Sequence, residues 1–140
     1  MLRSRLLLSL VVAVGLAGCT AQSSNKDSSS KFRGDQRLAA NTVEDFESAA
    51  SKGDQDKICR DLLANALVTQ YAQHGGTCEK TVDGALKDTD SFGLTVQRVT
   101  ITGTQAAVRV KADRGKKDVL RNITLVKEGP GWRISAFGSG

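Results

Sequence analysis

The sequence predicts a small α+β domain over residues 41–140, with helices in its first part and antiparallel strands in its second. Two observations predict this fold class. Apolar residues recur at helical spacing from Val43 to about Leu86, and from Phe92 onwards they alternate with a period of two. Turn residues, glycine above all, separate the alternating segments. The sequence shows no internal repeat, so one such domain accounts for the periodic part of the chain.

Three helices are expected before the strands. The first should begin near Asn41, with Thr42 as its N-cap, because threonine there can accept a hydrogen bond from a free backbone N–H group. Gly53 follows the last apolar residues of this helix, in the position where a residue without Cβ is favoured.

The second helix is expected to start after Asp54, its predicted N-cap, and to carry a broad apolar face over residues 58–71. The loop His74-Gly75-Gly76 should end it. Thr77 then caps a shorter third helix over about residues 78–86.

Four antiparallel strands should follow. The alternation changes phase at Gln97-Arg98, which predicts a β-bulge that bends the first strand. The loop Arg114-Gly115-Lys116-Lys117 and the turn Glu128-Gly129-Pro130-Gly131 separate the later strands, and the last strand covers residues 132–137.

The N-terminus has the three parts of a secretory signal, namely a basic start, an apolar stretch over residues 6–16, and small residues after it. The apolar stretch is shorter than the about 20 residues of a permanent membrane helix. The run Leu16-Ala17-Gly18-Cys19 resembles the lipobox of bacterial lipoproteins. This resemblance implies that residues 1–18 are removed and that Cys19 carries acyl chains of the palmitate kind, enough for stable anchoring. The alternative is a plain signal peptide with a coincidental cysteine.

The lipobox implies a protein of the cell membrane or outer membrane that is lipid-anchored and faces outside the cytoplasm. Residues 19–40 are predicted to be the lipidated cysteine and a flexible tether, because this stretch is rich in serine and poor in apolar side chains. The tether would hold the folded domain away from the membrane surface.

The charge of the chain is mild but uneven. Removing residues 1–18 removes two arginines, which leaves 18 basic and 15 acidic side chains and a net charge of +3. This value is too small to indicate nucleic-acid binding.

Residues 42–90 carry five basic and ten acidic side chains, whereas residues 91–140 carry nine basic and three acidic ones. The outer sheet face, with Arg109 and Lys111, could meet anionic lipid head groups or an acidic partner, or could simply keep the sheet soluble.

Once Cys19 is used for the anchor, Cys59 and Cys78 remain as a pair in an oxidising compartment, and we predict a disulfide between them. Closing this loop of about 20 residues contributes about 3 kcal/mol in the chain-entropy description. A zinc site would need two further ligands, and His74 is the only histidine in the chain. No metal site or cofactor is therefore predicted.

Three segments carry a resemblance to a known superfamily. They are the helix end Ala49-Ala50-Ser51-Lys52-Gly53-Asp54, the pair Cys59 and Cys78 around Leu62-Leu63, and the closing Gly131-Trp132-Arg133-Ile134. With them the chain resembles the nuclear transport factor 2-like (cystatin-like, SnoaL-like) superfamily, especially its small exported bacterial members. The resemblance implies three helices wrapped by a strongly bent sheet, which together form a cone around an apolar pocket.

The candidate pocket residues are Tyr71, Arg121 and Trp132. By strict alternation Arg121 shares a strand face with Ile123 and Leu125, and a buried arginine there would need an anion partner. The alternative is that Arg121 lies near a strand end and reaches water. Tyr71 could point its hydroxyl into the pocket or lie at the edge of the core.

No catalytic residues are predicted. Enzymes of the resembled superfamily carry an acid or base in the cone, but His74 reads as a solvated loop residue here. The leading hypothesis is therefore a non-enzymatic, lipid-anchored envelope domain that binds a protein partner or a small ligand. A SnoaL-like enzyme and a carrier of an apolar or lipid molecule are the alternatives.

Overall fold

The computed structural model describes residues 28–89, 92–114 and 117–138. The predicted α+β class is confirmed, with four α-helices in the described residues and one antiparallel sheet in the order β1-β2-β3-β4. The elements are, in chain order, the 3-10 turn η1 (Ser29–Lys31), α1 (Gly34–Lys52), α2 (Gln55–Lys57), the π-helical turn η2 (Ile58–Leu62), α3 (Asn65–Gln73), α4 (Cys78–Lys87), β1 (Gly93–Thr102), β2 (Gln105–Arg114), β3 (Lys117–Glu128) and β4 (Gly131–Phe137).

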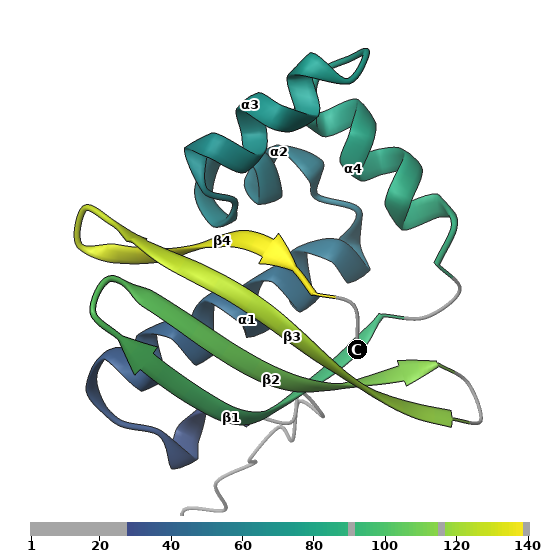
Figure 1. Ribbon diagram of the computed structural model, residues 1–140. Helices are drawn as coiled ribbons and strands as arrows, with labels where there is room; N and C mark the ends of the chain where they lie inside the picture. Colours follow the sequence, from purple (N-terminus) through teal and green to yellow (C-terminus); the bar gives the residue numbers. More distant parts are fainter. Residues whose placement is uncertain (1–27, 90–91, 115–116, 139–140) are drawn as a thin grey trace, which may run out of the picture.

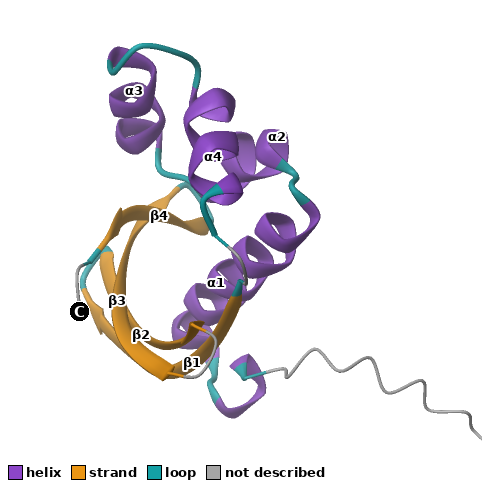
Figure 2. Ribbon diagram, turned by 90° about the vertical axis from the view of Figure 1, so that its right-hand side faces the viewer, coloured by secondary structure: helices purple, strands orange, loops and turns teal. Residues whose placement is uncertain are grey.

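The sheet is strongly curled. Helix α1 runs behind it in Figure 1, and Figure 2 shows α1 along the open side of the curl. This helix packs mainly against the two edge strands, β1 and β4. Helices α2, α3 and α4 gather beyond β4, at one end of the sheet (Figure 1). The outer face of the sheet carries no helix in either view.

The predicted bulge in β1 is confirmed, because the pairing of β1 with β2 shifts register between Val96 and Arg98. A second irregularity lies between Thr124 and Leu125, where β3 pairs with β4. Such irregularities increase twist and bend a sheet, and these two accompany the curl. The predicted turn between β3 and β4 is also confirmed, with Gly129 at φ 61°. The middle of the predicted β2–β3 loop, residues 115–116, lies outside the described residues.

The core lies between the inner face of the sheet and the helices. Alternate residues of each strand face inward, as the period of two predicted. The fully buried large side chains, each less than 2% exposed, come from both parts of the domain: Ile58, Leu63, Leu125, Ile134, Val43, Val96, Val108 and Val110.

The predicted start of the first helix is wrong. Helix α1 begins at Gly34 rather than near Asn41, and Thr42 is a buried residue inside it rather than its N-cap. The Thr42 hydroxyl lies 3.2 Å from the carbonyl oxygen of Leu38 and 3.1 Å from that of Trp132. Its single proton can serve only one of them at a time. The additional turns form because Ala39 and Ala40 are fully buried against the core.

Residues 28–40 belong to the folded part and not to a flexible tether. The Ser28 hydroxyl donates to Oε1 of Glu44 at 2.9 Å and accepts from the N–H group of Val96 at 3.0 Å. The backbone N–H of Ser29 also donates to Glu44, at 2.7 Å. Gln36 donates its side-chain amide to the carbonyl of Val99 at 3.1 Å. The predicted signal peptide and Cys19 lie outside the described residues.

The predicted second helix is interrupted, and the three expected helices therefore become four. Leu63 and Ala64 adopt extended backbone conformations between η2 and α3. The N–H group of Ala64 donates to the carbonyl of Ile134 in β4 at 2.7 Å. Leucine and alanine both favour helices, so the contact with β4 overrides the local preference here.

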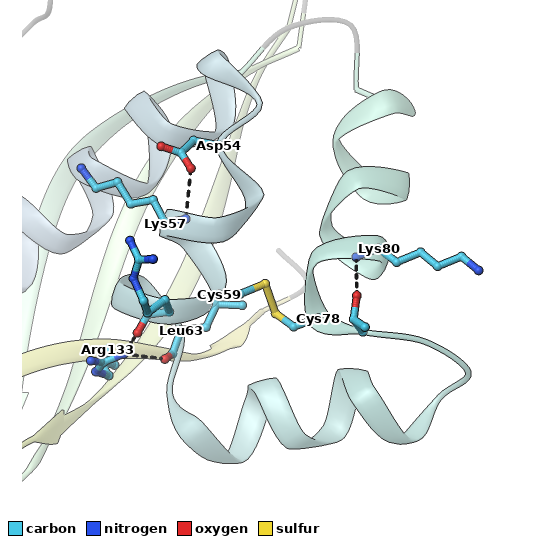
Figure 3. The surroundings of a disulfide bond; sticks show 9 residues. Asp54, Lys57, Cys59, Leu63, Cys78, Lys80 and Arg133 are labelled. Atoms are coloured by element: carbon cyan, nitrogen blue, oxygen red, sulfur yellow. Dashed lines mark hydrogen bonds between the residues drawn. A yellow bond between two sulfur atoms is a disulfide. The ribbon is translucent and has the colours of Figure 1, made fainter.

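Arg133 and Glu128 complete this interruption. The Arg133 guanidinium donates to the carbonyl oxygens of Arg60, at 2.6 Å, and Leu63, at 3.3 Å (Figure 3). Glu128 pairs with Arg133 at 3.6 Å and accepts from the N–H group of Asn65, the first residue of α3, at 3.1 Å. One ion pair thus satisfies carbonyls at the end of one helical segment and an N–H group at the start of the next.

The predicted helix ends at the other positions are confirmed. Gly53 follows α1 with a left-handed φ of 67°. The Asp54 carboxylate accepts from the N–H group of Lys57 at 3.0 Å, and the Thr77 hydroxyl accepts from that of Lys80 at 3.2 Å (Figure 3). These caps fix the starts of α2 and α4.

The predicted disulfide is present. Cys59 in η2 is bonded to Cys78, the first residue of α4, and both are buried (Figure 3). Helix α3 and the loop after it lie within the closed segment. Among the described residues, no helix is long and apolar enough to cross a membrane.

Candidate functional site

Two adjoining cavities form the candidate site. The first, here called the sheet cavity, has a volume of about 450 Å³ and lies at the inner face of the sheet. Its lining comes from the start of β1, from β2 and β3, and from the end of β4: Thr89, Phe92, Gly93, Leu94, Val110, Ala112, Asp113, Arg121, Asn122, Ile123, Phe137 and Gly138.

The second cavity, here called the helix cavity, has a volume of about 260 Å³. It lies mainly among the helices and is almost wholly lined by apolar groups: Phe46, Ile58, Leu63, Tyr71, Thr81, Val82, Ala85, Leu86, Thr89, Phe92 and Phe137. Since α4 supplies four of these residues and η2 supplies Ile58, the disulfide between η2 and α4 also holds the helix cavity in place.

Thr89, Phe92 and Phe137 line both cavities and therefore form the boundary between them. The ring of Phe46 in α1 lies 5.6 Å from that of Phe92 and 5.2 Å from that of Phe137, measured between centroids. Phe137 remains 44% exposed, so this aromatic boundary is not locked inside the core.

Arg121 supplies a positive charge to the sheet cavity. It lies on β3 opposite Val110 and is half-buried on the same inner face as Ile123, as the alternation of the strand predicted. Within the described part of the chain, the Arg121 guanidinium has no hydrogen-bond or ion-pair partner. The exposed Asp113 is among the lining residues of the same cavity, but by the alternation of β2 its side chain belongs to the outer face with Arg109 and Lys111. A guanidinium in this position can bind a carboxylate or phosphate through two parallel hydrogen bonds.

Tyr71 and Trp132 do not join Arg121 in one pocket. Tyr71 lies on α3, lines the helix cavity and is half-buried, and burial raises the pKa of its phenol. The hydroxyl is therefore a neutral hydrogen-bonding group near pH 7. Trp132 is only 3% exposed and lines neither cavity.

The indole of Trp132 is instead part of the core. The Lys127 ammonium lies 5.7 Å from the centroid of the indole ring, close enough for a cation–π contact. The indole Nε1 is buried and has no hydrogen-bond partner among the described residues. The sequence placed Trp132 at the pocket because a large aromatic residue on a terminal strand is equally compatible with a pocket wall and with a core.

Outside the cavity linings, Glu47 on α1 is a titratable group that sequence reasoning missed. Burial raises the pKa of its carboxyl, the negative charge of Glu44 adds to this, and a hydrogen bond from the backbone N–H of Leu94 opposes it. His74 follows α3 in an exposed loop and lines neither cavity.

The described residues contain no group of three or more histidine, cysteine, aspartate or glutamate side chains placed to hold a metal ion. Within those residues, the ionisable residues in the two linings are Asp113, Arg121 and Tyr71, and Arg121 has its side chain on the inner face of the sheet. This set can bind and orient a polar group beside an apolar surface.

Comparisons with protein-family models, with curated proteins and with solved structures gave no match to this chain.

Proposed function

We propose that this chain is a lipid-anchored protein of the bacterial cell envelope whose folded domain, of the nuclear transport factor 2-like type, acts by binding a small amphipathic molecule. Cys19 would be the acylated first residue of the mature protein, outside the cytoplasm, in the cell membrane or the outer membrane. The lipobox at residues 16–19 supports the anchor. The helices-first order and the curled four-stranded sheet support the assignment of the domain.

The observation that carries the binding function is the Arg121 guanidinium in a cavity that adjoins an apolar one. Removing a charged group from water is costly unless an opposite charge compensates it. An anionic head group would supply that compensation at Arg121, while the apolar part of the same molecule would extend past Phe92 and Phe137 into the helix cavity. Such sites combine apolar walls with a few well-placed polar groups, as ligand pockets commonly do.

A SnoaL-like enzyme that uses the same cavities is the alternative function. It would need an acid or base facing the substrate, and Asp113 is the acidic residue among those that line the sheet cavity. Turnover of a substrate that is abolished by Asp113→Asn, with substrate binding retained, would favour this alternative over a binding protein. Retention of a bound molecule without turnover would favour a binding protein or carrier.

The anchor is tested by changing Cys19→Ala in the full-length chain expressed in a bacterium with lipoprotein processing. We expect the variant to lose fatty-acid labelling and cleavage before residue 19. Continued labelling of the variant, together with its recovery in the membrane fraction, would show that Cys19 is not the anchor.

The binding site is tested by titrating the mature chain, carrying Cys19→Ser so that no acyl chain is attached, with dodecanoate and with dodecanol. We expect Arg121→Gln to weaken dodecanoate binding about tenfold or more, because a charge-assisted pair is lost, and to leave dodecanol binding nearly unchanged. Arg109→Gln, on the outer face of the sheet, is the matched control and should affect neither ligand. Equal affinity of the Arg121→Gln variant and the parent chain for dodecanoate would reject Arg121 as the head-group site.

A further inference from the structure

The point at which the chain enters the folded domain lies at the free edge of β1. The Ser28 hydroxyl accepts from the N–H group of Val96 there, so residue 28 is fixed beside that strand. Between Cys19 and Ser28 the chain can span at most about 3.3–3.6 Å per residue, or about 30 Å in all. An acyl anchor at Cys19 would therefore keep the β1 edge within about 30 Å of the membrane surface, much closer than a tether reaching to residue 40 would allow.

The outer face of the sheet beside this edge carries no helix (Figure 1), and three cations lie on it, with Asp113 and Asp118 on the same face at the far ends of β2 and β3. Arg98 on β1 and Arg109 on β2 are direct cross-strand partners, and both are exposed. Neither guanidinium has a hydrogen-bond or ion-pair partner in the described residues. Lys111, further along β2, is paired with Asp118 on β3 at 3.2 Å. We call Arg98, Arg109 and Lys111 the basic face.

Two arginines directly opposite each other on one sheet face repel, which destabilises the strand pair. Two exposed cations of the helical part are paired with carboxylates close to them in the sequence. Arg60 lies 2.6 Å from Asp56, and Lys87 lies 2.6 Å from Asp83. The arginine pair on the basic face lacks the compensation that Arg60 and Lys87 have. External anions held across both guanidinium groups would supply it.

We propose that the basic face docks on the anionic lipid head groups of the membrane that carries the anchor, so that the sheet lies against the bilayer with the helices pointing away. This inference rests on the anchored location under the proposed function, but not on ligand binding in the cavities. Lipid is favoured over an acidic protein because the covalent reach from Cys19 ends at the β1 edge beside Val96, two residues before Arg98, which keeps this face close to the membrane. In physiological salt, screening limits the attraction between the basic face and anionic head groups to about 8–10 Å. The short chain between Cys19 and Ser28 keeps the face near enough to the membrane to come within that distance.

The proposal is tested with the mature chain, residues 19–140, carrying Cys19→Ser so that membrane association does not depend on acyl chains. Co-sedimentation is measured with vesicles of phosphatidylglycerol and phosphatidylcholine in a 30:70 ratio, and with vesicles of phosphatidylcholine alone, at low and high salt. We expect binding to the anionic vesicles only, and loss of this binding at high salt. Because each surface cation contributes about fivefold, Arg98→Gln with Arg109→Gln should weaken binding about 25-fold.

Two control variants separate the basic face from total charge and from folding. Lys52→Gln with Lys80→Gln removes the same charge from exposed helical positions and should change binding less than twofold. Arg98→Lys with Arg109→Lys keeps the charge and should retain most of the binding, even if the strand pair is slightly perturbed.

Three results would overturn the proposal. The first is equal binding of the Gln double variant and the parent chain to anionic vesicles. The second is binding to neutral vesicles as strong as to anionic ones. The third is no vesicle binding together with binding to oligoglutamate that depends on Arg98 and Arg109, which would assign the basic face to an acidic protein instead.

Discussion

The sheet and the helices beyond β4 are held together in different ways. The sheet is a continuous antiparallel ladder of four strands, seven to twelve residues long, in which each strand supports the next. The segments α2, η2 and α3 have three, five and nine residues and are too short to be stable alone. They depend on the disulfide, on the Arg133–Glu128 pair and on the Ala64 contact to Ile134.

This difference indicates that the sheet and α1 form the most stable part of the domain. The helices that form the helix cavity are attached to this part through the few contacts just named. Loss of a core residue in the sheet should unfold the whole domain. Loss of one of these contacts should increase local unfolding of the helices before it affects the sheet.

The largest effect should come from Trp132 in β4, whose indole is buried in the core. We expect Trp132→Ala to lower the free energy of unfolding by about 3–5 kcal/mol, as for other large buried aromatic residues, in one cooperative transition. Urea unfolding followed by circular dichroism measures this.

Trp132→Phe is the matched variant. It should cost much less, because the indole Nε1 has no hydrogen-bond partner within the described residues and so its removal breaks no such bond. A Phe variant as unstable as the Ala variant would contradict this expectation.

Removing the Cys59–Cys78 bond should have the next largest effect. Chain entropy for a separation of 19 residues predicts a loss of about 3 kcal/mol, and a decrease in Tm of about 10 °C or more for a domain of this size. Reduction of the folded protein followed by thermal unfolding measures it, and hydrogen exchange should increase first in α3 and α4. Two titratable thiols in the unfolded, unreduced chain, in addition to that of Cys19 in its unacylated form, would contradict the bond.

The sequence made the sheet easier to predict than the helices, and the reason is physical. In the strands, burial alternates with a period of two that local sequence displays directly, and this also placed Arg121 on the inner face. The caps at Gly53, Asp54 and Thr77 are local too, since each depends on one residue and its near neighbours.

The interruption at Leu63-Ala64 could not be read from local sequence, because its cause lies in β4. Arg133 and Ile134, about 70 residues further along the chain, bind the backbone groups that a continuous helix would have used. In the same way, the serine-rich start looks like a tether by composition. Its Ser28 and Ser29 are ordered by Glu44 and Val96.

The candidate site was predictable only in pieces. Alternation indicates that Arg121 faces inward, but the two cavities exist because Phe46, Phe92 and Phe137 meet from three different elements. No residue spacing in the sequence indicates that these three rings come together. Trp132 lies in the core for a related reason, which is that α1 covers β4. The start predicted for the first helix lies too late in the chain to indicate this cover.

A smaller effect should follow from Arg133→Met, which keeps the aliphatic stem but removes the guanidinium. The carbonyls of Arg60 and Leu63 lose their donor, and we expect a cost of about 1–2 kcal/mol. Hydrogen exchange at Asn65 should increase more than exchange in β2. Arg109→Met, at an exposed arginine on the sheet, is the control and should be nearly neutral; similar losses for both variants would argue against the Arg133 contacts.

The smallest effect concerns the pH dependence of stability through Glu47 in α1. Because burial raises its pKa in the folded state, the folded protein binds this proton more tightly than the unfolded chain. Stability should therefore fall as pH rises from the ordinary glutamate pKa through the raised one. Glu47→Gln should remove this contribution, flattening the profile and slightly stabilising the protein at neutral pH. A steeper fall in the variant, measured by urea unfolding at several pH values, would contradict the assigned direction.

At both edges of the sheet, backbone groups are hydrogen-bonded to other parts of the chain. Ser28 and Gln36 take up backbone groups of β1, and Ala64 takes up one of β4. Exposed edge strands can pair with edge strands of other copies, which leads to aggregation. Confinement of many copies to a bilayer surface would raise the rate at which such edges meet. Under the proposed anchoring, Ser28 and Gln36 would therefore also help to protect the β1 edge from strand-to-strand association at the membrane.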